Sequence, residues 1–68
     1  MRNELDWIIR MPSSRFERVR QLKAERRFSG VVELVKVVPD GMWDLSAIVS
    51  CDTETDAALV CMVRDGKL

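Results

Sequence analysis

Two stretches rich in apolar residues, 31–38 and 42–50, flank a Pro-Asp-Gly sequence at positions 39–41. Proline presets the first angle of a turn, aspartate can hydrogen-bond its own backbone, and glycine accepts the positive φ that closes a tight loop. Valine-rich runs on both sides of such a turn are typical of an antiparallel β-hairpin. The pattern therefore predicts a hairpin with a three-residue loop, in which Val38 lies opposite Met42.

The same register predicts the two faces of the hairpin. It places Lys36 opposite Asp44, an opposite-charge pair across the strands that supports the alignment. Because side chains alternate along a strand, one face becomes the core side, and we expect the large Trp43 side chain to be buried there. The members of this core side are Val31, Val35, Val37, Trp43, Leu45, Ala47 and Val49. The opposite face carries a second apolar set, which consists of Val32, Leu34, Val38, Met42 and Ile48.

Two helices are predicted before the hairpin. A segment from residue 4 to about residue 10 begins with acidic residues, which favour a helix N-terminus, and Pro12 ends it because the residue before a proline avoids the helical region. Ser14 and Glu17 have the spacing of a capping box, so a second helix is expected over residues 15–27. The buried stripe of this helix would consist of Phe16, Val19 and Leu22.

The segment after the hairpin fits two structures. Thr53 precedes acidic residues that suit the first turn of a helix, and Gly66 is a candidate for the left-handed residue beyond its end. Residues 57–63, however, are apolar on every side and also fit a third strand. We take the helix as the primary prediction and the strand as the alternative. The expected fold class is α+β, with two N-terminal helices, a central antiparallel β-hairpin and a C-terminal helix in a single small domain over residues 1–68.

A chain of 68 residues leaves little room for a core. A domain of this size buries only ~60% of its unfolded surface, so it often needs a disulfide, a metal or a partner subunit. The chain has no His and only two Cys, so we expect a partner subunit, and not a metal or a disulfide framework, to stabilise the fold. No signal peptide is recognisable, and the longest apolar run is too short to span a bilayer. We therefore expect a cytoplasmic protein with no membrane partner.

The residue types argue against most catalytic chemistry. Without His, none of the serines has a recognisable general base, and no Lys stands in a known nucleophile motif. Cys51 and Cys61 have apolar neighbours in the sequence, where a thiol is usually an inert core residue. Asp52, Glu54 and Asp56 lack the glycine and the distal glutamate of a calcium loop, so we interpret them as solvated loop charges. No enzymatic activity, cofactor or metal is expected.

Charge is divided unevenly along the chain. Residues 1–30 contain eight Lys or Arg and four acids, whereas residues 31–68 contain three basic residues and seven acids. This division could serve an external partner, or the two halves could neutralise each other within the domain. In the second predicted helix the cations flank the apolar stripe, and the outward face is neutral to acidic. That placement weakens a nucleic-acid interpretation, which needs cations directed toward phosphates.

An excess of apolar residues is the feature that bears on function. One small core cannot enclose both faces of the hairpin together with the apolar segments on either side of it, and an exposed apolar patch marks an interface. The sequence therefore predicts a non-enzymatic regulator or inhibitor that binds another protein through an apolar surface and forms a homodimer. Small accessory proteins of phages and mobile elements often have this size.

The alternative is a nucleic-acid-binding module that uses the basic second helix. Salt dependence separates the two, because phosphate binding weakens steeply with salt and an apolar interface hardly responds. The candidate partner-binding residues are Val32, Leu34, Val38, Met42, Ile48, Arg15, Arg20, Lys23 and Arg27.

Overall fold

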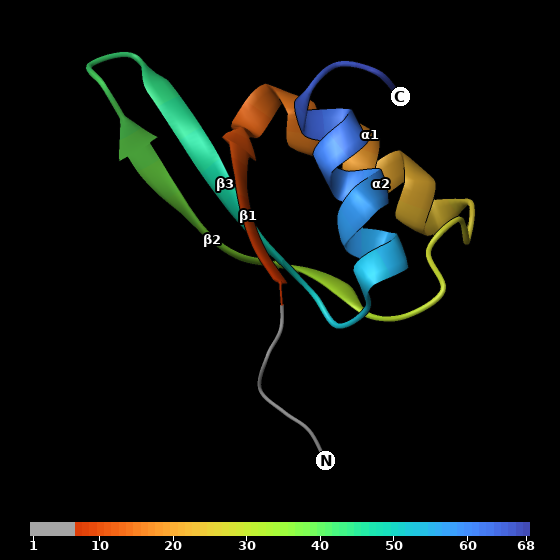
Figure 1. Cartoon of the computed structure of the whole chain (residues 1–68). Coiled ribbons are helices and arrows are strands. Elements are labelled where there is room, and N and C mark those ends of the chain that lie inside the picture. Colours follow the sequence, from red (N-terminus) through yellow and green to blue (C-terminus); the bar gives the residue numbers. More distant parts are fainter. Residues whose placement is uncertain (1–6) are drawn as a thin grey trace.

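The computed structural model describes residues 7–68, which form a three-stranded antiparallel sheet with two helices on one face (Figure 1). β3 lies in the middle of the sheet, between β1 and β2, and runs antiparallel to both. The predicted α+β class is confirmed, but one helix precedes the hairpin instead of two. The elements in chain order are β1 (Trp7–Pro12), α1 (Ser13–Ala24), β2 (Val32–Asp40), β3 (Asp44–Cys51) and α2 (Glu54–Arg64).

The first expected helix is wrong over the part that the structure describes. Residues 7–10 belong to β1, in which Ile9 and Met11 are buried and their neighbours are exposed. This alternation has the period of a strand, and pairing with β3 satisfies backbone groups that a short helix would leave without partners. Residues 1–6, which would hold the rest of that helix, lie outside the described residues.

The start of α1 differs from the prediction. Pro12 occupies the N-cap position and no side chain caps the helix, so the predicted capping box of Ser14 and Glu17 is not formed. Proline suits a helix N-terminus because it has no N–H group to leave unsatisfied. Val19 and Leu22 are buried, as the helical spacing predicts.

The end of α1 also comes early, at Ala24 rather than at Arg27. The Arg27 N–H donates to the Leu22 carbonyl at 2.9 Å, and the Arg26 N–H donates to the Lys23 carbonyl at 3.0 Å. These two bonds form a Schellman motif, which turns the chain out of the helix. The left-handed position of the motif is occupied by Arg26, with a φ of 60°.

The predicted hairpin is present, but its turn lies further along the chain and the predicted register is wrong. β2 continues through Pro39, and residues 41–43 form the turn. Asp40 therefore lies opposite Asp44, and Lys36 pairs with an apolar residue of β3 instead of Asp44. β2 tolerates Pro39 because it is an edge strand, whose outward N–H groups have no neighbouring strand to bind.

A β-bulge between Leu34 and Lys36 changes the faces of β2. Before the bulge, the alternation is the reverse of the predicted one. Val32 is buried in the core, and Leu34 stands on the same side of the strand. Val31 and Val35, which the sequence predicts in the core, are exposed.

Trp43 is the second correction to the predicted core. Trp43 is 88% exposed, because the turn lies at residues 41–43 instead of the predicted 39–41 and therefore includes it. The core instead lies between the sheet and the two helices. Its buried members are Ile9, Met11, Val19, Leu22, Val32, Ala47, Val49, Cys51, Ala57, Val60 and Val63.

The segment after the hairpin is a helix, so the strand alternative is wrong for these residues. The Thr53 hydroxyl accepts the Asp56 N–H at 3.2 Å and caps the start of α2. Gly66, with a φ of 77°, ends it, and the Lys67 N–H donates to the Met62 carbonyl at 2.8 Å. Both predicted ends are therefore confirmed. None of the described helices is long and apolar enough to cross a membrane.

Candidate protein-binding site

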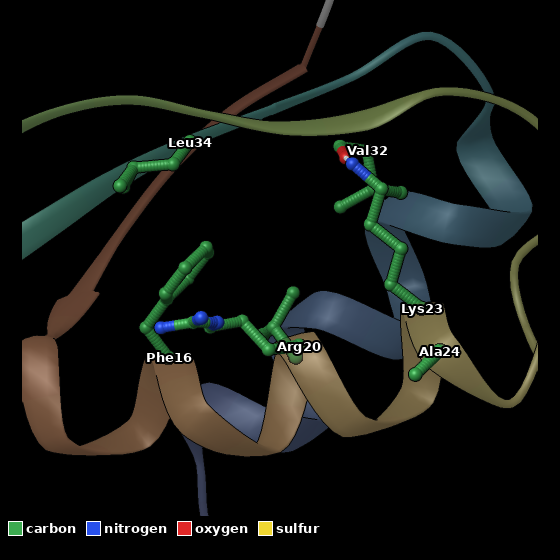
Figure 2. Close-up of a pocket in the computed structure, with 7 residues that line it drawn as sticks. Phe16, Arg20, Lys23, Ala24, Val32 and Leu34 are labelled. Carbon is green, nitrogen blue, oxygen red and sulfur yellow. Dashed lines mark hydrogen bonds between the residues drawn. The ribbon is translucent and has the colours of Figure 1, made fainter.

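A groove runs between α1 and β2 (Figure 2). Its volume is about 510 Å³, within the range of pockets that hold ligands. The groove exists because α1 packs mainly against α2, β3 and β1, which leaves the helix side of β2 partly uncovered. The residues that line it are Phe16, Val19, Arg20, Lys23, Ala24, Val32 and Leu34.

The floor of the groove is apolar. Val19 and Val32 are buried at its base, where they belong to the core. Phe16 points from α1 toward β2, and Leu34 extends from β2 above it (Figure 2). Leu34 is exposed and Phe16 is half-buried, so an apolar side chain inserted between them would remove further apolar surface from water.

Two cations form the rim of the groove. The Lys23 ammonium group donates a hydrogen bond to the Val32 carbonyl oxygen at 2.7 Å, which holds its stem across the groove. Arg20 lies one turn earlier on α1, and its guanidinium is 3.4 Å from the Glu17 carboxylate. Because this pair is exposed to water it contributes little stability, and an incoming carboxylate can compete for Arg20. The groove therefore combines an apolar floor with a positive rim.

The outer edge of β2 is protected against a further strand. The bulge between Leu34 and Lys36 distorts the edge, Pro39 offers no N–H group, and the Lys23 ammonium occupies the carbonyl of Val32. Each of these features discourages edge-to-edge pairing of strands. A partner would therefore meet this side of the molecule through side chains, and not by extending the sheet.

The end of the β2–β3 hairpin projects past the helices (Figure 1). We call its exposed apolar residues, Val37, Met42, Trp43 and Leu45, the hairpin overhang. Val37 and Leu45 stand on the helix side of the sheet, in the same alternation as the buried residues of β3, but no helix covers them. Together with Leu34, the overhang continues the apolar surface of the groove toward the turn.

Two carboxylates flank the hairpin overhang. Asp40 and Asp44 lie directly opposite each other at the ends of β2 and β3. The Asp40 carboxylate accepts a hydrogen bond from the Ser46 hydroxyl at 2.8 Å and lies 3.8 Å from the Arg10 guanidinium. The hairpin therefore ends in an apolar turn with acidic residues at its base.

The structure brings together four of the nine predicted partner-binding residues. Val32, Leu34, Arg20 and Lys23 all line the groove. Val32 and Leu34 face α1 because the bulge reverses the alternation of the first half of β2. Arg20 and Lys23 reach the same place because they flank the apolar stripe of α1, where the sequence places them.

The other predicted residues lie elsewhere. Val38 pairs with Ser46, and Ile48 lies between Arg10 and Lys36 on the face of the sheet that carries no helix. Both are half-buried. Met42 lies in the turn, at the far end of the hairpin from the groove. The five apolar candidates therefore do not share one face.

Arg15 and Arg27 are also separate from the groove. The Arg15 guanidinium lies against the last turn of α2, where a Cβ on Gly66 would approach its nitrogen to 3.0 Å. A cation in that position suits the negative end of the helix dipole. Arg27 forms an exposed ion pair with Glu25 at 3.5 Å.

Asp56 is fully buried, so its interpretation as a solvated loop charge is wrong. Its carboxylate accepts the backbone N–H groups of Ser29 at 2.8 Å and of Gly30 at 2.6 Å. Burial alone raises the pKa of this carboxyl, but these two donors, with the hydroxyls of Thr53 and Ser29, together hold its pKa below the usual value. The Thr53–Asp56 spacing, typical of a helix start, is the one signal in the sequence that this carboxylate has a local role.

Asp56 therefore works as a structural clamp on the loop that leads into β2. A Cβ at Gly30 would overlap the Asp52 carboxylate, so the loop passes too close to the residues that lead into α2 for a larger side chain. Among residues 7–68, no group of His, Cys, Asp or Glu could hold a metal ion. Comparisons of the chain with protein-family models, with curated proteins and with solved structures found no match.

Proposed function

We propose that this chain is a non-enzymatic protein-binding regulator or inhibitor, and that it holds an apolar segment of an acidic partner in the groove between α1 and β2. The observation that carries this proposal is the pairing of an apolar floor with a rim made by Arg20 and Lys23. An apolar anchor in a pocket supplies most of the energy of such a contact, and the charges around it select the partner.

The size of the surface favours a protein over a small ligand. The groove continues into the hairpin overhang, so one partner can cover Leu34, Val37 and Trp43 at once. Contiguous exposed apolar side chains on a small soluble domain are characteristic of an interface.

The nucleic-acid alternative has less support. Arg20 and Arg27 are paired with acids on the same chain, and the Arg18 guanidinium donates to the Gln21 side chain at 2.9 Å. The ammonium group of Lys23 is directed to a backbone carbonyl. An acidic protein partner would meet the same pairs, so the difference lies in the apolar floor, which a phosphate backbone would leave unused.

A selection from random peptides displayed on phage tests the proposal. We expect the selected peptides to share a large apolar residue flanked by Asp or Glu. Leu34→Lys should weaken the best peptide about tenfold or more, because it places a charge beside the apolar floor. Ile8→Lys is the control, since Ile8 is also an exposed apolar residue (62%, against 42% for Leu34) but lies on a different strand, away from the groove.

Two outcomes would contradict the proposal. One is a selection that enriches no common pattern, and the other is enrichment that Leu34→Lys does not disturb. Binding of a labelled DNA duplex that falls steeply with salt and ignores Leu34→Lys would instead favour the nucleic-acid alternative.

A further inference from the structure

Among residues 7–68, no helix or strand covers the face of the sheet opposite the helices, and we call this the open face (Figure 1). Because paired residues of neighbouring strands stand on the same side of a sheet, the registers of β1 and β2 with β3 define it. The half-buried side chains of Val38 and Ile48 lie there, and both belong to the apolar set through which the sequence predicts a homodimer. The charged residues of the open face that bear on association are Arg10, Lys36, Asp40 and Asp44.

Opposite charges on the open face are separated along the strands. Arg10 and Lys36 lie in one row across the sheet. Asp40 and Asp44 lie in a second row, where the turn begins. The two rows are four positions apart along β3, which is about 13 Å at the usual rise per residue, and Ser46 lies midway between them. The open face therefore has a cationic row on one side of Ser46 and an acidic row on the other.

Each row holds a charge that the chain itself does not balance. Arg10 lies 3.8 Å from Asp40. Neither Lys36 nor Asp44, however, forms an ion pair with another of residues 7–68. Asp40 and Asp44 also face each other directly across the hairpin, where like charges repel. A cation from another molecule would therefore stabilise the acidic row, and a carboxylate would stabilise Lys36.

We infer that the open face binds the open face of a second copy of this chain, so that Lys36 of each copy meets Asp44 of the other. A two-fold axis that runs between the two sheets and crosses the strands at Ser46 exchanges the two rows. The cationic row of each copy then lies over the acidic row of the other. Because both copies use the same patch, the assembly closes at a dimer. The two grooves stay on the outer sides, so the inference goes beyond the proposed function.

The side chains at the axis allow the two sheets to approach. Stacked sheets lie about 10 Å apart, which suits small and apolar residues at the centre. Ser46 is 2% exposed and its hydroxyl already donates to Asp40 at 2.8 Å, so a second sheet leaves no donor unsatisfied there. Val38 pairs with Ser46, so the two copies of Val38 meet at the axis. Glu33, in the row beyond the cations, faces the uncharged residues 41–43 of the other copy.

A hollow beside the acidic row gives the lysine room. Its volume is about 330 Å³, and its lining includes Asp40, Asp44 and Trp43. A cation that reaches both carboxylates enters this hollow. The Trp43 ring also favours a cation, because the face of an aromatic ring attracts positive charge. Lys36 carries its charge on a long, flexible stem, which suits it to this position.

Sedimentation equilibrium at micromolar concentration tests the association. We expect a mass twice that of the 7.8 kDa chain. Val38→Lys should raise the dimer dissociation constant about tenfold or more, because it brings two like charges together at the axis. Leu34→Lys is the matched control, since Leu34 lies on the same strand but lines the groove, and it should leave the dissociation constant unchanged. Circular dichroism of both variants verifies that they are folded.

A charge exchange identifies the contact itself. Lys36→Asp and Asp44→Lys should each weaken the dimer about tenfold, because each places like charges together in both halves of the interface. Asp44→Lys also puts an opposite charge across from Asp40 in its own chain, so its effect on the dimer does not come from a weaker fold. Combining the two changes in one chain should return the dissociation constant to within about threefold of the wild type. Lys67→Asp makes the same change of charge beyond the end of α2 and should have no effect.

The failure of this inference can be told from failure of the proposed function. A wild-type chain that stays monomeric overturns the inference, as does a double variant weaker than both single variants. A dimer that Leu34→Lys disrupts and Val38→Lys does not would also overturn it, because the second copy would then occupy the groove. Peptide binding is measured separately, since the groove and the open face lie on opposite sides of the sheet. A dimer that binds no peptide would support the inference and contradict the proposed function.

Discussion

The carboxylate of Asp56 ties the loop before β2 to the first turn of α2. It is fully buried, and it accepts hydrogen bonds from the N–H groups of Ser29 and Gly30. A buried charge without donors is strongly unfavourable, and so are buried N–H groups without an acceptor. The carboxylate and the two N–H groups therefore need each other. Their contact fixes the loop that leads into β2, and with it the position of Val32 in the groove.

We expect Asp56→Asn to lower the free energy of unfolding by about 3 kcal/mol. The asparagine keeps the size of the side chain but loses the charge, and it turns an NH₂ group toward one of the backbone donors. Urea unfolding followed by circular dichroism measures the effect. Glu54→Gln, at an exposed position in the same helical turn, should change the free energy by less than about 0.5 kcal/mol.

The pH dependence of stability provides a second measurement on Asp56. Its pKa is lower in the folded chain than its usual value of 3.8. The stabilisation is therefore complete above the usual value and is lost as the pH falls through the lower folded pKa. The free energy of unfolding of the wild type should decline below about pH 4, and Asp56→Asn should decline less. Equal slopes for the two proteins would contradict this account of the clamp.

At the level of the elements, the two helix ends show what local sequence can and cannot predict. α2 follows the prediction because Thr53 and Gly66 both supply the chemistry that a helix terminus needs. α1 ends in the same Schellman motif, but its left-handed residue is Arg26. An arginine gives no sign of this conformation, so the sequence predicts too long a helix.

Arg26→Gly should stabilise the chain by about 1 kcal/mol, because glycine adopts a positive φ without the steric cost of a Cβ. Thermal unfolding would show a higher midpoint. Arg26→Ala is the control for the loss of charge, since it keeps the Cβ and should bring no gain. An equal gain from both variants would assign the effect to charge instead of to the backbone.

The sheet shows a different limit of sequence reasoning. Pro39 has the features of a turn residue, but an edge strand accepts it, so the turn moves to residues 41–43. The bulge before Lys36 then reverses the first half of β2. β1 is missed because so short an apolar segment forms a strand only when β3 lies beside it. The helix side of the groove is nevertheless predictable, since the helical period of α1 places Arg20 and Lys23 beside its apolar stripe.

On the scale of the whole molecule, the ion pairs among residues 7–68 do little to neutralise the uneven charge of the two halves. Among residues 7–68, the pairs of Arg20, Arg27 and Arg64 each join acids from their own half of the sequence. The pair of Arg10 with Asp40 is the one that links the two halves. Positive charge on α1 and negative charge at the hairpin turn therefore remain available to another molecule.

The homodimer that the sequence predicts would make thermal stability depend on concentration. Dimerisation favours the folded chain by mass action, so the unfolding midpoint should rise as the chain concentration is raised. Calorimetry over a hundredfold range of concentration measures the shift. A midpoint that does not move for the wild type would contradict the dimer.

The bond from Lys23 to the Val32 carbonyl has a consequence for the bound state. A carboxylate that enters the groove competes with this carbonyl for the same ammonium group. If the carboxylate wins, one of the protections on the edge of β2 is released at the moment of binding. Binding of a carboxylate in the groove would therefore make the edge of β2 easier for another strand to pair with. Arg20 reduces this effect, because it can bind the carboxylate while Lys23 keeps its bond to the Val32 carbonyl.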